Sequence, residues 1–374
     1  MFSKILILLP ALSGIVNAGP NGGAGDTLGR SLNVRDIAPV LDFTQSTWIW
    51  TGEQTGPSDV APVGVRPFRK AIPSSSTKCP VCATILLSCD DHYSIFVNGR
   101  EIGSGACWRS TAPFMSSYVF TVGLDPEGHN VVAIAGENVD GPAGLIATVL
   151  VDYSDGTTET IVTDNTWKTL KVAPPGGWTS PSYNDTAWTT AVSEGPTEST
   201  PWKSPPLPPA LDMIGVHWIQ TNESVSSGSA NGLGHRPFRK TITSPYGKAA
   251  VCGKVVLSAE DSYTLYVNGK NIGSGSGWTK MQAYPIPELE TDTNLVAVDG
   301  ASTRANDRVY LAASVLIAYN DGTSEVYLTD GSWKTMNGLP PAGFEQPDAD
   351  DSDWYGATIW PDRTVGTDVT VPYA

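Results

Sequence analysis

The stretch LLSCDDHYSIFVNG (residues 86–99) decides the fold, because the chain contains a second version, VLSAEDSYTLYVNG, at residues 256–269. The two versions are 170 residues apart and share seven of their 14 positions. A second repeated motif, RPFRK at 66–70 and 236–240, has the same spacing, since 236 − 66 = 170. Solenoid repeats are much shorter, about 20–50 residues. The sequence therefore predicts two tandem domains of one fold.

The repeated stretch itself has the character of a β-hairpin. Residues 93–97 and 263–267 are rich in aromatic and β-branched residues, and each run is followed by an Asn-Gly pair. Asn-Gly between such runs is a strong hairpin signal, because both turn residues adopt φ > 0. We find no sustained apolar period of 3.6 residues elsewhere in the chain. Many short strands separated by turn signals predict an all-β protein built from two β-sandwich domains.

Composition divides the chain into four parts. Residues 1–18 have the pattern of a secretory signal peptide. We expect the first sandwich at 46–192 and the second at 212–365. The segment between them, 193–211, is dense in Pro and Ser. That composition favours an extended, semi-rigid linker.

The N-terminal segment predicts a secreted, extracellular protein. Lys4 precedes an apolar stretch at 5–16, which is too short to span a bilayer, since that takes about 20 residues. Small residues at 16–18 fit a cleavage site. In an extracellular protein, Asn184 and Asn222 would be glycosylation sites, because both lie in Asn-x-Ser/Thr motifs.

The overall charge argues against two classes of partner. There are 38 Asp and Glu residues against 23 Lys and Arg, a net charge of −15. No basic patch is visible along the chain. Nucleic acid and anionic membrane surfaces attract basic proteins. We therefore expect no nucleic-acid partner and no membrane insertion.

Five cysteines suggest disulfide bonding in an oxidising compartment. Cys89 and Cys107 correspond to Ala259 and Gly277 in the second copy, so that copy lacks both. Their joint absence predicts a Cys89–Cys107 disulfide in the first domain. Two alternatives remain open. Cys79 could pair with Cys82, or Cys82 and its counterpart Cys252 could be small buried hydrophobes.

The residues shared by both copies resemble a known module. Their order is similar to that of the galactose-binding-like jelly-roll β-sandwiches found as non-catalytic modules of α-L-rhamnosidases, including the N-terminal sandwich and the rhamnose-binding type. The residues that carry this resemblance are Trp48, Phe68-Arg69-Lys70, Asp91, Tyr93, Val97-Asn98-Gly99, Gly103, Trp108, 128–133, Gly144, Tyr153, Asp155-Gly156, Thr163-Asp164, Trp167-Lys168, Asn184-Asp185, Trp188 and Ala191. The resemblance implies two jelly-roll domains and a carbohydrate partner, such as a rhamnose- or galactose-containing glycan. It does not extend to a catalytic barrel.

Hairpin geometry predicts where a ligand site lies. The strand at 93–97 and its return are of similar length, so the loop at 103–108 should lie beside the turn that contains Asp90 and Asp91. The second copy offers equivalent residues, and a further loop in the first copy is the next candidate. The candidate ligand-binding residues are therefore Asp90, Asp91, Trp108, Asn138, Asp140, Glu260, Asp261 and Trp278.

The residue types at these positions suit sugar binding. An aromatic face can stack on the apolar side of a sugar ring, while carboxylates and amides accept hydrogen bonds from hydroxyls. Asp90 and Asp91 could instead hold Ca²⁺, which prefers oxygen ligands. A structural interpretation stays open, in which Asp91 and Asp261 stabilise a tight turn and the tryptophans fill the sandwich edge.

Other tryptophans are more readily explained by burial. Three pairs recur on or beside predicted strands, and we expect most of their members in the cores: Trp48 and Trp218, Trp167 and Trp333, and Trp188 and Trp354.

The sequence offers little support for catalysis. None of the four histidines has a histidine counterpart in the other copy. No metal-spaced His/Cys set and no Gly-x-Ser-x-Gly motif is present. We therefore expect a non-catalytic, lectin-like carbohydrate-binding protein. The alternatives are an extracellular structural or adhesion protein and a stand-alone glycoside hydrolase of the rhamnosidase type.

Overall fold

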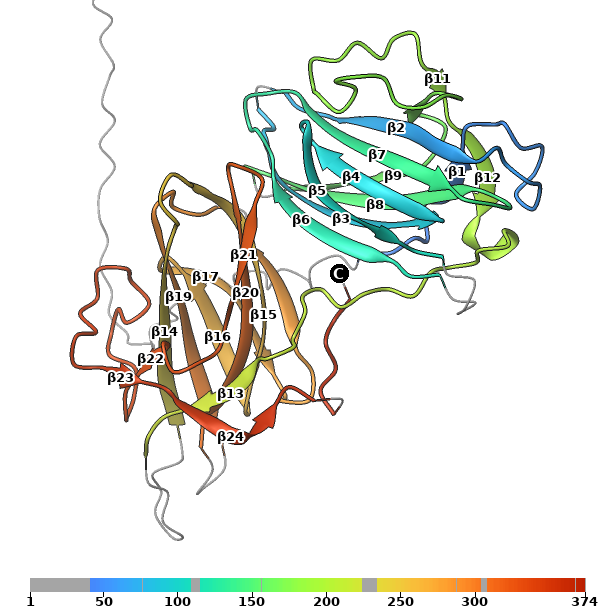
Figure 1. Ribbon diagram of the computed structural model, residues 1–374. Coiled ribbons are helices and arrows are strands. Elements are labelled where there is room, and N and C mark those ends of the chain that lie inside the picture. The colour runs from blue at the N-terminus through green and yellow to red at the C-terminus, as the bar shows by residue number, and fades with distance from the viewer. Residues whose placement is uncertain are drawn as a thin grey trace, which may run out of the picture. The chain divides into compact units, whose positions relative to one another are not determined.

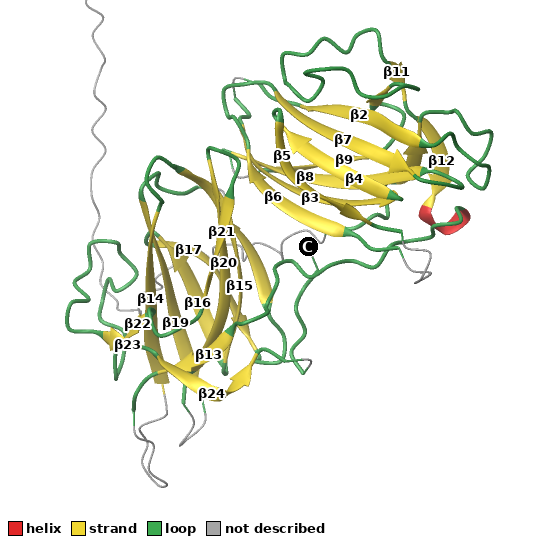
Figure 2. Ribbon diagram, in the orientation of Figure 1, coloured by secondary structure: helices red, strands yellow, loops and turns green. Residues whose placement is uncertain are grey.

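The structure, a computed structural model, describes residues 41–75, 77–108, 115–155, 157–223, 234–286, 288–303, 308–366 and 368–373. These residues form strands and loops, apart from one short 3-10 helix, η1 (Thr197–Ser199) (Figure 2). Within the described ranges, no helix is long and apolar enough to cross a membrane. The predicted signal peptide at 1–18 lies outside the described residues.

The first sandwich consists of two six-stranded antiparallel sheets (Figure 1). One sheet has the order β12 (Val192–Pro196), β1 (Thr47–Trp50), β8 (Gly144–Tyr153), β3 (Pro80–Asp90) and β6 (Tyr118–Gly123), with β9 (Thr158–Val162) paired to β8. The other has the order β11 (Thr189–Thr190), β10 (Lys168–Thr169), β2 (Gly64–Ile72), β7 (Asn130–Asn138), β4 (His92–Val97) and β5 (Arg100–Ala106).

The second sandwich repeats this strand order. One sheet runs β18 (Gln282–Ile286), β15 (Ala250–Ala259), β20 (Tyr310–Tyr319), β13 (His217–Gln220) and β24 (Thr358–Thr364), with β21 (Ser324–Leu328) paired to β20. The other runs β17 (Lys270–Ser276), β16 (Ser262–Val267), β19 (Thr293–Ser302), β14 (Gly234–Thr243), β22 (Lys334–Thr335) and β23 (Tyr355–Gly356). Each strand has one counterpart in the first sandwich. The predicted tandem β-sandwich fold is confirmed.

The predicted hairpins form as expected. Asn98 and Gly99 have φ values of 52° and 88°, and Asn268 and Gly269 have values of 48° and 79°. These values lie in the left-handed region that the tight turn requires. Burial alternates along β4 and β16, because successive side chains of a strand point to opposite faces.

Tryptophan side chains fill the sandwich cores. Trp48, Trp167, Trp218 and Trp333 are almost completely buried, and Trp188 is buried as well. Trp354 is partly exposed and packs against a smaller apolar cluster. The expectation that most of these tryptophans are in the cores is confirmed.

The disulfide differs from the prediction. Cys82 on β3 is bonded to Cys252 on β15, with a Cα–Cα distance of 6.0 Å, so the bond joins the two sandwiches. Cys89 and Cys107 are buried free thiols, and Cys79 is a partly exposed one. The predicted Cys89–Cys107 bond is therefore wrong. It treated each copy in isolation, whereas the bonded cysteines occupy equivalent positions of the two copies.

The segment predicted as a linker begins inside the first sandwich. Residues of β12 pair with β1, and Trp202 is buried. The Pro- and Ser-rich composition was misleading because the segment begins in β12, an edge strand of its sheet, where Pro is tolerated.

Candidate functional site

The two acidic turns lie at equivalent places in the two sandwiches. Asp90 ends the long central strand β3, and the Asp90–Asp91 and Glu260–Asp261 peptide bonds are both cis. The carbonyl oxygen of Asp91 accepts a hydrogen bond from Cys107 N at 2.9 Å. In the second sandwich, Asp261 O accepts one from Gly277 N at 2.8 Å. The predicted convergence of the acidic turn and the Gly-rich loop is therefore confirmed.

The side chains of Asp91 and Asp261 connect these turns to a third loop. Asp91 is only 7% exposed, and its Oδ2 accepts hydrogen bonds from Val139 N at 2.7 Å and Asp140 N at 3.4 Å. Asp261 Oδ2 accepts hydrogen bonds from Thr303 N at 2.8 Å and Thr303 Oγ1 at 2.7 Å. In each sandwich this aspartate therefore holds together two loops at one end of that sandwich.

Asp90, the other residue of the acidic turn in the first sandwich, is buried, with 5% of its surface exposed. Its Oδ2 accepts a hydrogen bond from Trp202 Nε1 at 2.6 Å, while Oδ1 has no hydrogen-bond partner among the described residues. Burial raises the pKa of Asp90 to about 8, although the bond from Trp202 favours the charged form. The neighbouring charges of Asp91 and Asp140 raise the pKa further.

Trp202 is a site residue that the sequence did not single out. Its ring packs on that of Trp48, with centroids 4.8 Å apart. Gly144 makes this contact possible, because a Cβ there would lie 2.9 Å from both indoles. Since Trp202 lies within the predicted linker, only its location in the folded chain shows that it belongs to the first sandwich.

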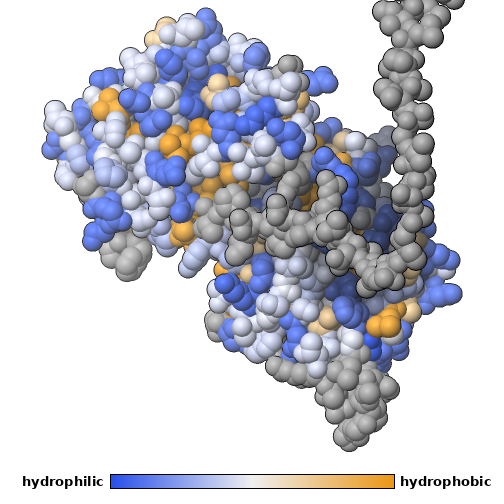
Figure 3. Space-filling model, turned by 180° about the vertical axis from the view of Figure 1, so that it is seen from behind, coloured by the Kyte–Doolittle hydropathy of each residue, from blue (hydrophilic) through white to orange (hydrophobic). Residues whose placement is uncertain are grey.

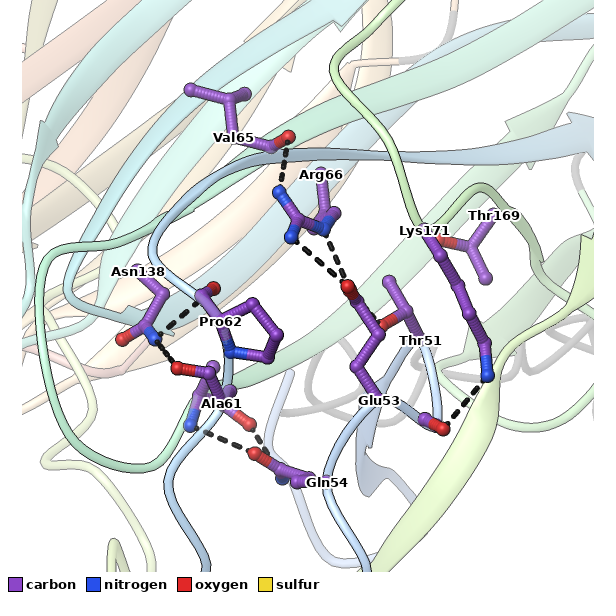
Figure 4. Close-up of polar contacts among 12 residues, drawn as sticks. Thr51, Glu53, Gln54, Ala61, Pro62, Val65, Arg66, Asn138, Thr169 and Lys171 are labelled. Atoms are coloured by element: carbon purple, nitrogen blue, oxygen red, sulfur yellow. Dashed lines mark hydrogen bonds and ion pairs between the residues drawn. The ribbon is translucent and has the colours of Figure 1, made fainter.

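Asn138 holds the loop between β1 and β2 (Figure 4). It is completely buried, and its Nδ2 donates to Ala61 O at 2.9 Å and to Pro62 O at 3.4 Å. The next residues are more accessible, since Asp140 is exposed and Val139 is 46% exposed. Asn138 therefore frames the loop end and Asp140 lies on its surface.

An ion pair that the sequence reasoning missed anchors the same loop. Arg66 Nε and Nη2 donate to the carboxylate of Glu53 at 2.6 and 3.0 Å (Figure 4). Burial opposes ionisation of Glu53, but the hydrogen bonds from Arg66 and Thr51 lower its pKa. Arg236 and Glu223 form the same pair in the second sandwich. The signal was available in the sequence, because Glu223 lies 170 residues after Glu53 and Arg236 lies 170 residues after Arg66.

The remaining candidates lie at the edge of the cores. Trp108 is partly exposed and packs against the first core, and Trp278 is partly exposed and packs against a cluster on the second sandwich. Glu260 is also partly exposed. In the part of the chain that the structure describes, no group of three or more His, Cys, Asp or Glu side chains is placed to bind a metal ion. Calcium binding by Asp90 and Asp91 stays a prediction.

Comparisons with known proteins place this geometry in a family. No family model matches the chain. The structure of a lectin from Pleurotus ostreatus in complex with GalNAc is 40% identical, with a TM-score of 0.79, over 90% of this chain and 98% of that one. Its apo form matches with a TM-score of 0.80.

A longer enzyme is also similar. An α-L-rhamnosidase of Streptomyces avermitilis is 25% identical over 361 residues, which cover 85% of this chain and 32% of the enzyme. The chain thus spans about a third of the length of that curated relative. The likeness to the lectin, by contrast, extends over nearly the whole of both proteins. The chain therefore belongs to the family of the Pleurotus ostreatus lectin and is a non-catalytic, carbohydrate-binding lectin.

Proposed function

We propose that this lectin is secreted and binds glycans that display N-acetylgalactosamine or galactose. The observation that carries the sugar class is the 40% identity, over 90% of the chain, to a lectin whose structure contains GalNAc. Rhamnose-containing glycans are the second candidate, because the chain also resembles rhamnosidase modules. Secretion is supported by the pattern at 1–18 and by the Cys82–Cys252 disulfide, a bond typical of oxidising compartments.

We place the sugar at the loop end of each sandwich. In the first, Trp108 and Asp140 provide accessible aromatic and carboxylate groups, while Asp90, Asp91 and Asn138 hold the loops from behind. An aromatic ring can stack on the apolar face of a galactose-type ring, and a carboxylate can accept hydrogen bonds from the hydroxyls of that sugar. In the second sandwich, Trp278, Glu260 and Asp261 take these roles.

Retention on GalNAc-bearing beads tests this function. The mature wild-type protein should be retained and then released by free GalNAc. Trp108→Ala and Trp278→Ala should each reduce retention, and the double variant should abolish it, with thermal midpoints that stay within a few degrees of wild type. If the variants fold and retention is unchanged, the proposed site is wrong.

The same experiment with a chelator tests the calcium prediction. Loss of retention in chelator, restored by added Ca²⁺, would assign the carboxylates to an ion. Unchanged retention would mean that Asp90 and Asp91 act without one. A parallel array of rhamnose- and galactose-containing glycans distinguishes the two candidate sugar classes.

Glycosylation and secretion are tested together by expression. Asn184 and Asn222 are both exposed, as an acceptor must be. The protein recovered from the medium should begin after residue 18 and should lose mass on treatment with an N-glycosidase. A protein retained inside the cell with residues 1–18 intact would contradict secretion.

A further inference from the structure

Two stacked aromatic rings of the second sandwich stand at positions that carry no aromatic residue in the first sandwich. Tyr310, at the start of β20, and Trp360, on β24, are stacked with centroids 4.5 Å apart and an interplanar angle of 25°. Both side chains are partly exposed. Both pack against the same apolar cluster as Trp278. The three aromatic residues therefore belong to one apolar cluster.

The aromatic pair lies beside the acidic turn. Glu260 N donates a hydrogen bond to Tyr310 O at 3.1 Å, which continues the register in which Ala259 is opposite Leu311. Residues directly opposite on neighbouring strands place their side chains on the same face. The partly exposed carboxylate of Glu260 and the Tyr310 ring are thus neighbours on one face of the sheet.

Strand register identifies the corresponding positions in the first sandwich. Ile49 pairs with Leu145 and Ile219 with Leu311, so Gly144 corresponds to Tyr310. Trp50 pairs with Val192 and Gln220 with Thr358, so Glu194 corresponds to Trp360. Neither aromatic residue has an aromatic counterpart.

The first sandwich fills this region from within. At Gly144 there is room for the buried ring of Trp202, whose Nε1 binds Asp90, the counterpart of Glu260. That carboxylate is therefore only 5% exposed, whereas Glu260 is partly accessible. The two sandwiches have equivalent strands and acidic turns, but they differ in the aromatic residues beside the turn.

We propose that the second sandwich has an additional sugar subsite. In it, a pyranose ring lies against Tyr310 and Trp360, and one of its hydroxyls donates a hydrogen bond to the Glu260 carboxylate. An aromatic platform beside a carboxylate is the chemistry that recognises a ring with one apolar face and several hydroxyls. The first sandwich lacks this subsite, so the two sites differ in affinity. The inference rests on the proposed carbohydrate binding and goes beyond it by making the sites unequal.

Titration calorimetry of the full chain with GalNAc, galactose and a galactose-containing disaccharide tests the proposal. The wild type should show two classes of site. Trp360→Ala should weaken one class roughly tenfold, the size expected for loss of one aromatic contact, and leave the other unchanged. Tyr246→Ala is the matched control, because Tyr246 is a fully exposed aromatic residue on the same sandwich; it should change neither class.

A second variant guards against misfolding. Trp360→Phe keeps an aromatic ring on Tyr310 and should weaken the same class by a smaller factor. If the wild type binds with two classes and both Trp360 variants leave them unaltered, the subsite is wrong while the proposed function stands. Two identical binding sites in the wild type would also overturn the proposed subsite. Absence of any binding by the wild type would overturn the proposed function itself.

Discussion

Asp90 has the most unusual environment of the candidate residues. It is a buried carboxylate with one hydrogen bond from Trp202, and the described residues give its second oxygen no partner. Removing a carboxylate from water disfavours its charged form. The pKa of about 8 therefore means that the folded protein favours the protonated acid at neutral pH.

The raised pKa predicts a pH dependence of stability. Because the folded-state pKa lies above the unfolded value of about 3.9, the stability linked to Asp90 is complete below that value and is lost as pH rises through about 8. Asp90→Asn keeps an acceptor for Trp202 and cannot ionise. In chelator, the thermal midpoint of the wild type should fall more between pH 5 and pH 8 than that of the variant. Parallel curves would contradict the assignment.

Gly144 gives a second prediction for a single residue. A Cβ at this position would lie 2.9 Å from the Trp48 and Trp202 rings, and such overpacking typically costs about 1–3 kcal/mol. Gly144→Ala should therefore lower the free energy of unfolding in urea by about that amount. At Gly176 a Cβ meets no atom within 4 Å, so Gly176→Ala is the control and should have almost no effect.

At the scale of elements, one arginine on β2 organises the long loop between β10 and β11. Arg69 is buried, pairs with Asp185 at 2.8 Å, and donates to the carbonyl oxygens of Trp178 and Ser180. Arg239 repeats this arrangement with Asp351 at 2.9 Å. The loop thus depends on a single side chain from the neighbouring strand, which explains why the motif RPFRK recurs in both copies.

Removal of this arginine should be costly. Arg69→Met leaves Asp185 and several carbonyl groups without their donor, and breaking a buried ion pair typically costs about 3–5 kcal/mol. Because the Asp185 side chain is 30% exposed, we expect a loss near 3 kcal/mol in urea denaturation. Lys70→Met, at the adjacent and more accessible residue, should change the free energy of unfolding by less than about 0.5 kcal/mol. Equal effects would refute the organising role.

At the scale of the whole molecule, the two sandwiches are joined by the Cys82–Cys252 bond as well as by the peptide chain. On the face shown in Figure 3, apolar side chains gather in patches among hydrophilic ones.

The Cys82–Cys252 bond closes a loop of the chain that spans 170 residues. Closing a long loop strongly restricts the conformations of the unfolded chain. The disulfide therefore stabilises the folded chain relative to the unfolded one.

Replacing both bonded cysteines by serine should lower the free energy of unfolding by about 2–4 kcal/mol. Cys79→Ser should have little effect, because that thiol is free. In the native protein, iodoacetamide should modify Cys79 but not Cys89 or Cys107, since both are buried and burial raises the pKa of Cys107 to about 12. Non-reducing peptide maps that show a Cys89–Cys107 linkage would contradict this account.

The sequence predicted the fold well because the chain contains two copies of the same fold. Asn-Gly turns and alternating strands are local signals, and the second copy confirmed each one. The same locality explains the failures. The Cys82–Cys252 bond joins two copies, and the contact between Trp202 and Asp90 joins residues 112 positions apart. Neither has a local pattern. Hairpin geometry did place the acidic turn beside the Gly-rich loop, because that proximity follows from strand length alone.

The central claim, that this lectin binds GalNAc or galactose at the loop ends of its sandwiches, is tested most directly by one calorimetric titration. Mature wild-type protein and the Trp108→Ala/Trp278→Ala double variant would each be titrated with GalNAc. The account predicts saturable binding by the wild type and its loss in a double variant that still unfolds cooperatively. Equal binding by both proteins would contradict the site, and absence of binding by the wild type would contradict the function.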